Sequence, residues 1–450
     1  LQATFAVETN LDRLATLAEI DPLKLRLDNA QQVGDISPQG MVFRSCGFRN
    51  CLERAAELSD WSHKRVEWGL SNPLGPKGVL RRGIGIASLL HVGGGAKIYR
   101  SDGCGTRLSI DHFGKVHLST GATEIGQGSE TVLAALVADE LGLEIVDIRV
   151  TNDDTRFTPW DVGVHASRTS FIAGNSALKA ARKVRRILLT AASERVGMPV
   201  ESLTLRQRAV WNCNSEEEVM TIDSLVRELH FSGEHELLEV QVFYEPPSKY
   251  QDEKFHGDVS ASYAWGVQVV EVEVDMQTGV VRPLQVTSVH DVGKVLNQLG
   301  IIGQVEGGVA MGLGYGLTEE LLLQDGCVTN PSFRDYHLLS ASEMPPVQID
   351  FIESNDPEGP HGAKGIGEAP AIPTAAALVN AVAHATGVWV TQLPLKPEVV
   401  LQAMRGAGVD ARTTTPPSIA NLAPNTDFPL PVTSKPAPND ARLSQEEVSE

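Results

Sequence analysis

The stretch at residues 267–289, VQVVEVEVDMQTGVVRPLQVTSV, decides the fold. Valines alternate with polar residues on both sides of Thr278-Gly279, and alternation around a glycine turn predicts a β-hairpin. This hairpin leads into residues 302–317, IGQVEGGVAMGLGYGL, which read as a glycine-rich apolar helix. The stretch therefore predicts a sheet that is followed directly by a helix.

The same order of features occurs once earlier in the chain. Residues 106–121, TRLSIDHFGKVHLSTG, alternate around a turn and lead to residues 124–142, EIGQGSETVLAALVADELG. A second hairpin followed by a second glycine-opened helix is an internal repeat, which predicts two structurally related halves that face each other. Short alternating strands mixed with apolar helices indicate the α+β class.

Each predicted hairpin brings a Gly-Gln pair, Gly126-Gln127 and Gly303-Gln304, to the expected start of a helix. Glycines at this place expose backbone N–H groups, and the helix dipole favours an anion such as phosphate there. The alternative is that Gly126 and Gly128 only shape a turn and that Gln127 faces solvent. The repetition of the pair favours the binding interpretation.

The composition excludes several classes of protein. The chain has 450 residues, 42% of them hydrophobic, and a formal net charge of −19. This length can bury two or three domain cores, and the negative charge disfavours nucleic acid and anionic membranes as partners. No apolar stretch is long enough for a membrane span, and no P-loop, Rossmann, zinc or nucleophile-elbow motif occurs.

The five cysteines are odd in number and sparse for the length. This fits a reducing compartment, so we expect a cytoplasmic protein with structural thiols. Cys46 and Cys51 have the spacing that opens some iron-sulfur motifs, but no third cysteine follows them.

The chain divides into four expected regions. Residues 1–78 read as a helical connector, in which Asp21 caps a helix that starts at Pro22. Residues 79–250 and 251–408 are the two related subdomains of mixed sheets and helices. Residues 409–450 are rich in proline and predict an extended C-terminal arm.

The segment GAKGIGEAP, residues 362–370, places Glu368 at the mouth of a helix expected over residues 371–386. The helix is apolar nearly all round, which predicts burial. A carboxylate at a helix start is commonly a simple dipole cap. The competing interpretation is that the buried helix raises the pKa of Glu368 towards the range that a general base needs.

Four segments, in this order, resemble the molybdenum-binding subunit of the xanthine dehydrogenase and aldehyde oxidase family of molybdenum hydroxylases. The segments are GATEIGQGSETVLAALVADELG (121–142), NQLGIIGQVEGGVAMGLG (297–314), NPSFRDYHL (330–338) and GAKGIGEAPAIPTAAALVNAVAHATG (362–387). The resemblance spans roughly residues 1 to 408. It implies the family's molybdopterin-binding fold and its cofactor, a molybdenum-molybdopterin in the cytosine dinucleotide form.

The resemblance assigns roles to individual residues. Glu368 matches the catalytic glutamate, and no protein side chain ligates the metal, which the pterin dithiolene holds. Trp160 and His165 are candidates for the substrate pocket, although Trp160 could equally be a packed core residue and His165 a satisfied polar one. The residues that match cofactor-binding positions are Gly126, Gln127, Gly128, Ala166, Ser167, Arg168, Gln304, Lys364, Gly365, Ile366 and Gly367.

The implied reaction oxidises an electron-poor carbon of an aromatic, N-heterocyclic or acyl-CoA substrate, with water as the oxygen source. Glu368 is the base, and the glycines around it let the backbone approach the metal centre. Two alternatives stay open. One is reductive dehydroxylation of an aromatic acyl-CoA thioester, as in hydroxybenzoyl-CoA reductase, and the other is a noncatalytic assembly subunit.

The resemblance also implies partners. The family's upstream half carries a GGxFGxK-like loop and an FRG loop that do not occur here, so we expect a second molybdenum-subunit half to complete the site. Residues 5–29 resemble the segment that follows the FRG loop. Electrons are expected to leave through 2Fe-2S clusters and FAD on an iron-sulfur subunit and a flavin subunit.

Overall fold

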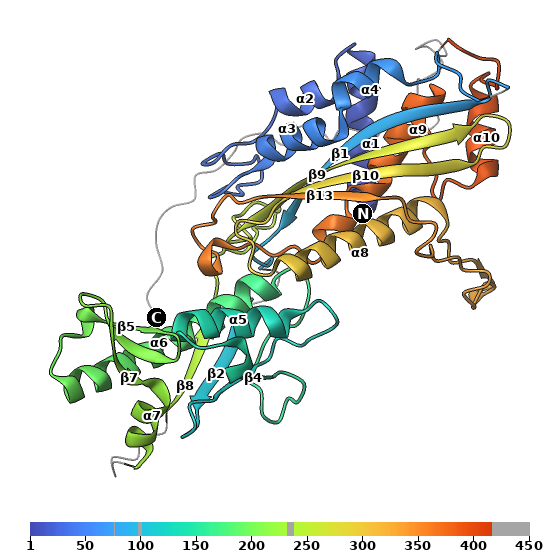
Figure 1. Ribbon diagram of the computed structural model, residues 1–450. Helices are drawn as coiled ribbons and strands as arrows, with labels where there is room; N and C mark the ends of the chain where they lie inside the picture. The colour runs from blue at the N-terminus through green and yellow to red at the C-terminus, as the bar shows by residue number, and fades with distance from the viewer. Residues whose placement is uncertain (76, 98–100, 232–237, 416–450) are drawn as a thin grey trace, which may run out of the picture.

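The computed structural model describes residues 1–75, 77–97, 101–231 and 238–415. Most of the arm expected at residues 409–450 lies outside the described residues, because the description ends at residue 415. The described chain forms two lobes, each built on a four-stranded sheet (Figure 1). The mixed sheets and helices confirm the α+β class.

The larger lobe, here the second lobe, contains the predicted hairpin of residues 267–289. Its sheet has the order β1-β9-β10-β13, with β1 at Leu80–Val92, β9 at Tyr263–Asp275, β10 at Val281–Asp291 and β13 at Val347–Ile352. Strands β1, β9 and β10 are antiparallel, and β13 runs parallel to β10. The turn between β9 and β10 lies at the predicted Thr278-Gly279.

The smaller lobe, the first lobe, contains the other predicted hairpin. Its sheet has the order β4-β3-β2-β8, with β2 at Cys104–Ile110, β3 at Val116–Thr120, β4 at Ile148–Thr151 and β8 at Glu239–Tyr244. Strands β2 and β3 are the expected antiparallel pair, and β4 is parallel to β3. A side sheet of β5 (Leu203–Arg206), β6 (Ala209–Asn212) and β7 (Glu217–Thr221) and helix α7 (Ile222–Phe231) complete this lobe.

The two lobes repeat one arrangement, which confirms the predicted internal repeat. In each, a hairpin, a helix, a strand parallel to the hairpin and a second helix follow one another. The helices are α5 (Ser129–Leu141) and α6 (Thr169–Val196) in the first lobe, and α8 (Gln298–Leu317) and α9 (Thr374–Thr386) in the second.

Strand β1 has no counterpart in this repeat, and its position differs from the expected subdomain boundary. Strand β1 pairs with the central strand β9 along its whole length, from Leu80 to Val92. It therefore belongs to the second lobe, although residues 79–250 were expected to form one subdomain. The hydrogen bonds of a 13-residue ladder determine its place, and sequence order does not.

The N-terminal helices pack against the second lobe and do more than connect. Figure 1 shows α2, α3 and α4 on one face of its sheet, while α8, α9 and α10 cover the other face. Helix α1 lies beside β1 and also packs against α9. Buried Glu8 accepts hydrogen bonds from Arg26 at 2.7 Å and from the backbone N–H of Ser88 in β1 at 2.8 Å. These bonds fix α1 and α2 on the sheet. The helices are α1 (Gln2–Leu17), α2 (Pro22–Asp28), α3 (Phe48–Ser59), α4 (Trp61–Glu67) and α10 (Pro397–Gly406).

Helix α9 is buried on every side, as its apolar sequence predicts. It lies so close to β1 that a Cβ at Gly83 would come within 2.1 Å of the Ala381 carbonyl oxygen. This close approach explains why small residues fill both elements. The helix therefore gives the loop before it a rigid support.

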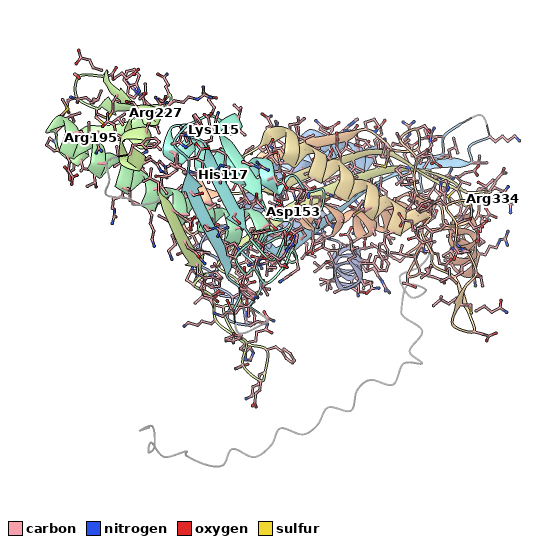
Figure 2. All side chains as sticks on the ribbon, turned by 90° about the horizontal axis from the view of Figure 1, so that it is seen from below. Lys115, His117, Asp153, Arg195, Arg227 and Arg334 are labelled. Atoms are coloured by element: carbon pink, nitrogen blue, oxygen red, sulfur yellow. The ribbon has the colours of Figure 1, made fainter. Side chains whose placement is uncertain are left out.

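One small hairpin lies far from the contact of the two lobes (Figure 1). Strands β11 (Leu323–Gln324) and β12 (Cys327–Val328) form a small hairpin of the second lobe. Figure 2 shows Lys115 and His117 on the first lobe and Arg334 towards the far end of the second. Among the described residues, no helix is long and apolar enough to cross a membrane.

Candidate active site

Three adjoining cavities form one groove, here called the interlobe groove. The middle cavity, of about 200 Å³, is lined by residues of both lobes, among them Gln127, Gln304 and Glu368. A cavity of about 710 Å³ shares Gln304, Gly367 and Glu368 with it and extends along α8. A third, of about 60 Å³, shares Gln127 and Gln304 and lies at the start of α8. Gln304 thus lines all three cavities.

The central strand of the second lobe holds the end of the Glu368 loop. In β9, the buried Gln268 amide donates a hydrogen bond to the Pro370 carbonyl at 2.7 Å. The Gln268 carbonyl accepts one from the Thr374 hydroxyl, also at 2.7 Å. Pro370 belongs to the short 3-10 turn Ala369–Ala371 that directly follows Glu368. Strand β9 and helix α9 therefore fix where Glu368 enters the groove.

The glycines of this loop allow a close crossing of two backbones. A Cβ at Gly365 would lie 1.6 Å from the Ser167 carbonyl oxygen, which no side chain could tolerate. The Gly365 N–H also donates a hydrogen bond to the Gly93 carbonyl at 2.8 Å. At Gly367 a Cβ would meet nothing closer than the Ser167 hydroxyl at 3.6 Å. Gly365 thus serves loop packing, whereas Gly367 faces open space.

Glu368 has a precise set of neighbours. Its Oε2 lies 3.1 Å from Nε2 of His91, and its side chain is 56% exposed. The Glu368 N–H donates a hydrogen bond to the Ser167 hydroxyl at 2.9 Å. The same hydroxyl lies 3.1 Å from His91 Nε2. Three distant segments of the chain therefore meet at one carboxylate.

The pKa of Glu368 is lowered from its ordinary value. The hydrogen bond from His91 is the largest cause, burial opposes it, and the charge of His91 and the backbone of Ala166 add to the lowering. The expectation that the buried helix raises this pKa is wrong, because Glu368 stands outside the buried helix and keeps much of its solvent contact. Glu368 is ionised at neutral pH and can accept a proton.

The loop before α6 is strained, and its arginine is structural. Ala166 and Ser167 have φ values of 49° and 51°, in the left-handed region that side chains disfavour. The Arg168 guanidinium is fully buried and pairs with Asp102 at 3.0 Å and Asp161 at 2.8 Å. Its side chain fixes this loop, since a buried cation needs its own counterions. Arg168 also lines the middle cavity, so its expected part in cofactor binding stays a prediction.

Lys364 also forms a buried ion pair. Its ammonium group lies 2.6 Å from Oδ2 of Asp291, and neither side chain is exposed. Asp291 also accepts a hydrogen bond from the Gly47 N–H at 2.9 Å. The charge of Lys364 therefore anchors the Glu368 loop to β10. Lys364 lines the small cavity, and the neighbouring Ile366 lines the middle and small cavities.

The start of α5 already holds an anion of the chain itself. The Glu124 carboxylate accepts hydrogen bonds from the N–H groups of Gly126, Gly128 and Glu130 and from the Ser129 hydroxyl, at 2.8 to 3.2 Å. Burial opposes ionisation of Glu124, but these hydrogen bonds lower its pKa overall. The expected phosphate site at this helix start is therefore filled internally.

The two glutamines of the sequence repeat differ in position. Gln127 precedes α5, and its amide turns back to the Ile125 N–H at 2.6 Å and the Thr123 carbonyl at 3.1 Å. Gln304 lies inside α8, not at its start, because that helix already begins at Gln298. No hydrogen bond joins the Gln304 side chain to another described residue. The expectation of two equivalent helix starts is wrong.

The two candidates for the substrate pocket separate in space. Trp160 stacks on Phe243 with 6.0 Å between ring centroids, and it lines none of the three cavities. His165 lines the middle cavity. Burial is the main cause that lowers the pKa of His165, and the charge of Arg168 adds to it.

Reasoning from the sequence missed His91. It lies near the end of β1 and lines the larger cavity. The pattern that could have indicated it was weak: His91 stands directly before Val92 and three glycines. Its strand was also expected in the first subdomain and not in the second lobe. Gln268 was missed as well, because its partners lie 102 and 106 residues away.

Comparisons with known proteins agree with this geometry. A family model described as a molybdopterin cofactor-binding domain matches residues 54–345. The xanthine dehydrogenase molybdenum-binding subunit of Escherichia coli O157:H7 is 34% identical over 419 residues, which cover 91% of this chain and 53% of that protein. A probable xanthine dehydrogenase subunit of Bacillus subtilis (strain 168) is 31% identical, with 91% and 52% covered. The chain thus spans about half the length of these curated relatives.

Two solved structures share the fold. Carbon monoxide dehydrogenase from Oligotropha carboxidovorans superposes with a TM-score of 0.79 at 24% identity, over 90% of this chain and 51% of that chain. Quinoline 2-oxidoreductase from Pseudomonas putida 86 gives a TM-score of 0.80 at 23% identity, over 90% and 52%. Identities this low establish the fold and leave the substrate open.

Proposed function

This chain belongs to the molybdopterin cofactor-binding family of the xanthine dehydrogenase type, and from that premise we propose that it is part of a molybdenum hydroxylase. The reaction would oxidise an electron-poor carbon of an aromatic, N-heterocyclic or acyl-CoA substrate, with water as the oxygen source. In sum, substrate and water would give the hydroxylated product, two protons and two electrons. The observation that carries the proposal is the meeting of Glu368 and Gln304 in one groove between two related lobes.

The residues of the groove fit a polar, elongated cofactor. The Gln304 amide has no partner among the described residues and lines all three cavities. A Cβ added at Gly307 would enter the larger cavity without meeting any atom within 4 Å, so the helix face is open there. Among the described residues, no three His, Cys, Asp or Glu side chains form a group that could hold a metal ion. In the proposal, the pterin holds the metal.

We infer that Gln304 and the backbone at Gly367 would hold this cofactor, with Ile366 packed against it. Gln127 lines the same cavities, and its amide would have to turn from its own loop to bind there. Amide groups suit this task because they donate and accept hydrogen bonds without adding charge. Arg168 and Lys364 would contribute by holding the loops in place. When bound, the cofactor supplies the redox centre that takes two electrons from the substrate.

Glu368 would act as the general base. Its lowered pKa keeps the carboxylate ionised at neutral pH, and its exposure leaves it accessible to a proton donor in the groove. Accepting a proton from the attacking oxygen would make that oxygen a better nucleophile. His165 lines the same cavity, and its lowered pKa favours the neutral imidazole beside a substrate.

The partners belong to the same proposal. The relatives are named as subunits and large chains of dehydrogenases, and this chain spans about half their length. We infer that a second molybdenum-subunit half completes the groove and that an iron-sulfur subunit and a flavin subunit carry the electrons away. The cytosine dinucleotide form of the cofactor and a cytoplasmic location are also part of the proposal.

Neither alternative function has a specific observation in its favour. Reductive dehydroxylation would use the same groove in reverse, but the relatives are named as dehydrogenases, hydroxylases and oxidoreductases. A noncatalytic assembly subunit would have no need for a carboxylate and an unpartnered amide facing one groove.

The substitution Glu368→Gln in the complete complex tests the proposal. We expect molybdenum and pterin content to stay at the wild-type level, because the variant keeps the side-chain shape. The rate constant kcat should fall by about 10²- to 10⁴-fold, since a general base contributes that much. Metal analysis and steady-state kinetics on the same preparation measure both.

Glu343→Gln is the matched control. Glu343 also pairs with a histidine, His337, at 2.9 Å, but it lies outside the groove. This variant should keep full activity. A Glu368→Gln complex that turns over at the wild-type rate, or a wild-type complex without molybdenum, would contradict the proposal.

A further inference from the structure

The groups around Glu368 come from three separate parts of the chain. His91 stands near the end of β1, Ser167 in the strained loop before α6, and Glu368 before α9. His91 Nε2 lies 3.1 Å from the Glu368 carboxylate and 3.1 Å from the Ser167 hydroxyl, and that hydroxyl accepts the Glu368 N–H at 2.9 Å. The three groups form a closed triangle of contacts at the groove wall.

From this geometry, and resting on the proposed function, we propose that His91 is a positioning residue for Glu368. Its Nε2–H donates a hydrogen bond to Oε2 of Glu368, while Ser167 holds the backbone N–H of the same residue. Together they fix the direction in which the carboxylate faces the groove. His91 acts through Glu368 and exchanges no proton with the substrate.

The supports of His91 and Ser167 suit this role. A backbone hydrogen bond joins the segment of His91 to the loop of Glu368. The Gly365 N–H donates to the carbonyl of Gly93, two residues beyond His91, at 2.8 Å. The His91 side chain is only 16% exposed, so it has little freedom to turn away. The backbone of Gly365 packs directly against the Ser167 carbonyl, with no room for a Cβ between them.

The other charged groups near Glu368 are weaker candidates for this role. The charge of His165 also lowers the pKa of Glu368, but this effect is smaller than that of His91. Arg168 and Asp161, which face His165 from the same loop, form a buried ion pair with each other at 2.8 Å. The hydrogen bond from His91 is the largest contribution to the lowered pKa of the Glu368 carboxylate, and the backbone of Ala166 adds a smaller one. His91 therefore has the strongest side-chain influence on how this carboxylate is held.

The experiment compares His91→Ala with His91→Gln in the full 450-residue chain. Glutamine places an amide N–H close to the position of Nε2, whereas alanine removes the donor. The readout that does not depend on turnover is an infrared titration of the Glu368 carboxylate with ¹³C-labelled glutamate, using Glu368→Gln as the spectral blank. We expect the carboxylate of His91→Ala to titrate at higher pH than in the wild type, and His91→Gln to restore the wild-type position.

Kinetics on the complete complex give a second readout. In His91→Ala, kcat should fall by about ten- to a hundredfold, because a reacting group loses its orientation. The acid limb of the pH profile should move to higher pH, KM should stay unchanged, and His91→Gln should recover most of the rate. A general loss of fold would instead lower the melting temperature and affect both variants.

The control is His337→Ala, which removes a histidine from the Glu343 pair outside the groove. It should leave the Glu368 titration and the kinetics unchanged. The positioning role fails if His91→Ala titrates like the wild type, or if His91→Gln behaves like His91→Ala. Failure of the proposed function would look different: the titration would still move in His91→Ala, while the wild-type complex would lack molybdenum or turnover.

Discussion

Two glycine-rich loops border the same groove, and the glutamate in each loop has a different set of hydrogen-bond partners. Glu124 accepts four hydrogen bonds from the loop and helix that follow it, so both of its oxygens are used within the first lobe. Among the described residues, the Glu368 carboxylate pairs with His91 and receives a smaller contribution from the backbone of Ala166, and its side chain is 56% exposed. The difference separates a structural carboxylate from a chemically available one. A count of neighbouring donors distinguishes them better than their similar sequence surroundings.

The glycines of the two loops are required for different physical reasons. Gly126 and Gly128 have φ values of 101° and 79°, and a Cβ at either would meet nothing within 4 Å. They are needed for backbone conformation. Gly365 has no such φ, but a Cβ there would strike the Ser167 carbonyl. It is needed for space. One residue type thus serves two physical purposes in two similar segments.

Gly365→Ala should have the largest effect. Its Cβ would lie 1.6 Å from the Ser167 carbonyl oxygen, so one of the two loops must move. We expect a loss of about 3 kcal/mol or more in the free energy of unfolding, at the upper end for an overpacked site. Chemical denaturation measures it.

Gly367→Ala is the matched control for this substitution, because its nearest contact would be an ordinary 3.6 Å. It should cost less than about 1 kcal/mol. If the two variants lost equal free energy of unfolding, the conclusion that Gly365 is needed for space and Gly367 is not would be wrong.

Sequence patterns predicted the parts of the fold that depend on neighbours in the chain. Alternation gave both hairpins, because the side chains of a strand point to its two faces in turn. The uniformly apolar run gave the buried helix α9. The place of β1 could not be predicted in this way, since its partner β9 lies about 180 residues later and both strands are largely buried.

The candidate site was predictable to a similar degree. The resemblance matched Glu368 to the catalytic glutamate and Gln304 to a cofactor-binding position, and the structure brings both residues to one cavity. It did not reveal that Arg168 forms a buried ion pair with Asp161 and Lys364 one with Asp291, because ion-pair partners leave no local pattern in the sequence. The role of His91 could not be predicted for the same reason, because its partners Ser167 and Glu368 are far from it in the sequence.

Glu124→Ala and Glu368→Ala should then differ in their effect on stability. Removing Glu124 leaves the first N–H groups of α5 without their acceptor, which costs about 1 to 2 kcal/mol for a lost helix cap. Removing Glu368 should change stability by less than about 0.5 kcal/mol, as is usual for an exposed side chain. Denaturant titration of both variants provides the comparison. If Glu368→Ala were the more destabilising, the structural and chemical roles would be assigned the wrong way round.

Gly126→Ala should have a smaller effect of about 1 kcal/mol, because alanine must adopt a left-handed backbone there. Gly303→Ala is its matched control. That residue also has nothing within 4 Å of its Cβ position, but it lies in α8. Alanine should stabilise α8 by about 0.5 to 1 kcal/mol, since glycine is a poor helix former. Destabilisation of similar size in both would show that open space, and not φ, decides the outcome.

The smallest expected effect is a pH dependence of the Glu124 contribution. Its folded-state pKa is lowered, so the unfolded chain binds the proton more tightly than the folded one. The stabilisation is therefore complete above the unfolded pKa of glutamate, about 4.3, and is lost as the pH falls through the lower folded value. The stability difference between wild type and Glu124→Ala should shrink below about pH 4.3, by less than about 1 kcal/mol because the carboxylate is partly exposed. A difference that stays constant or grows in acid would mean that the neutral acid caps α5 as well as the carboxylate does, and that charge plays no part in closing this loop.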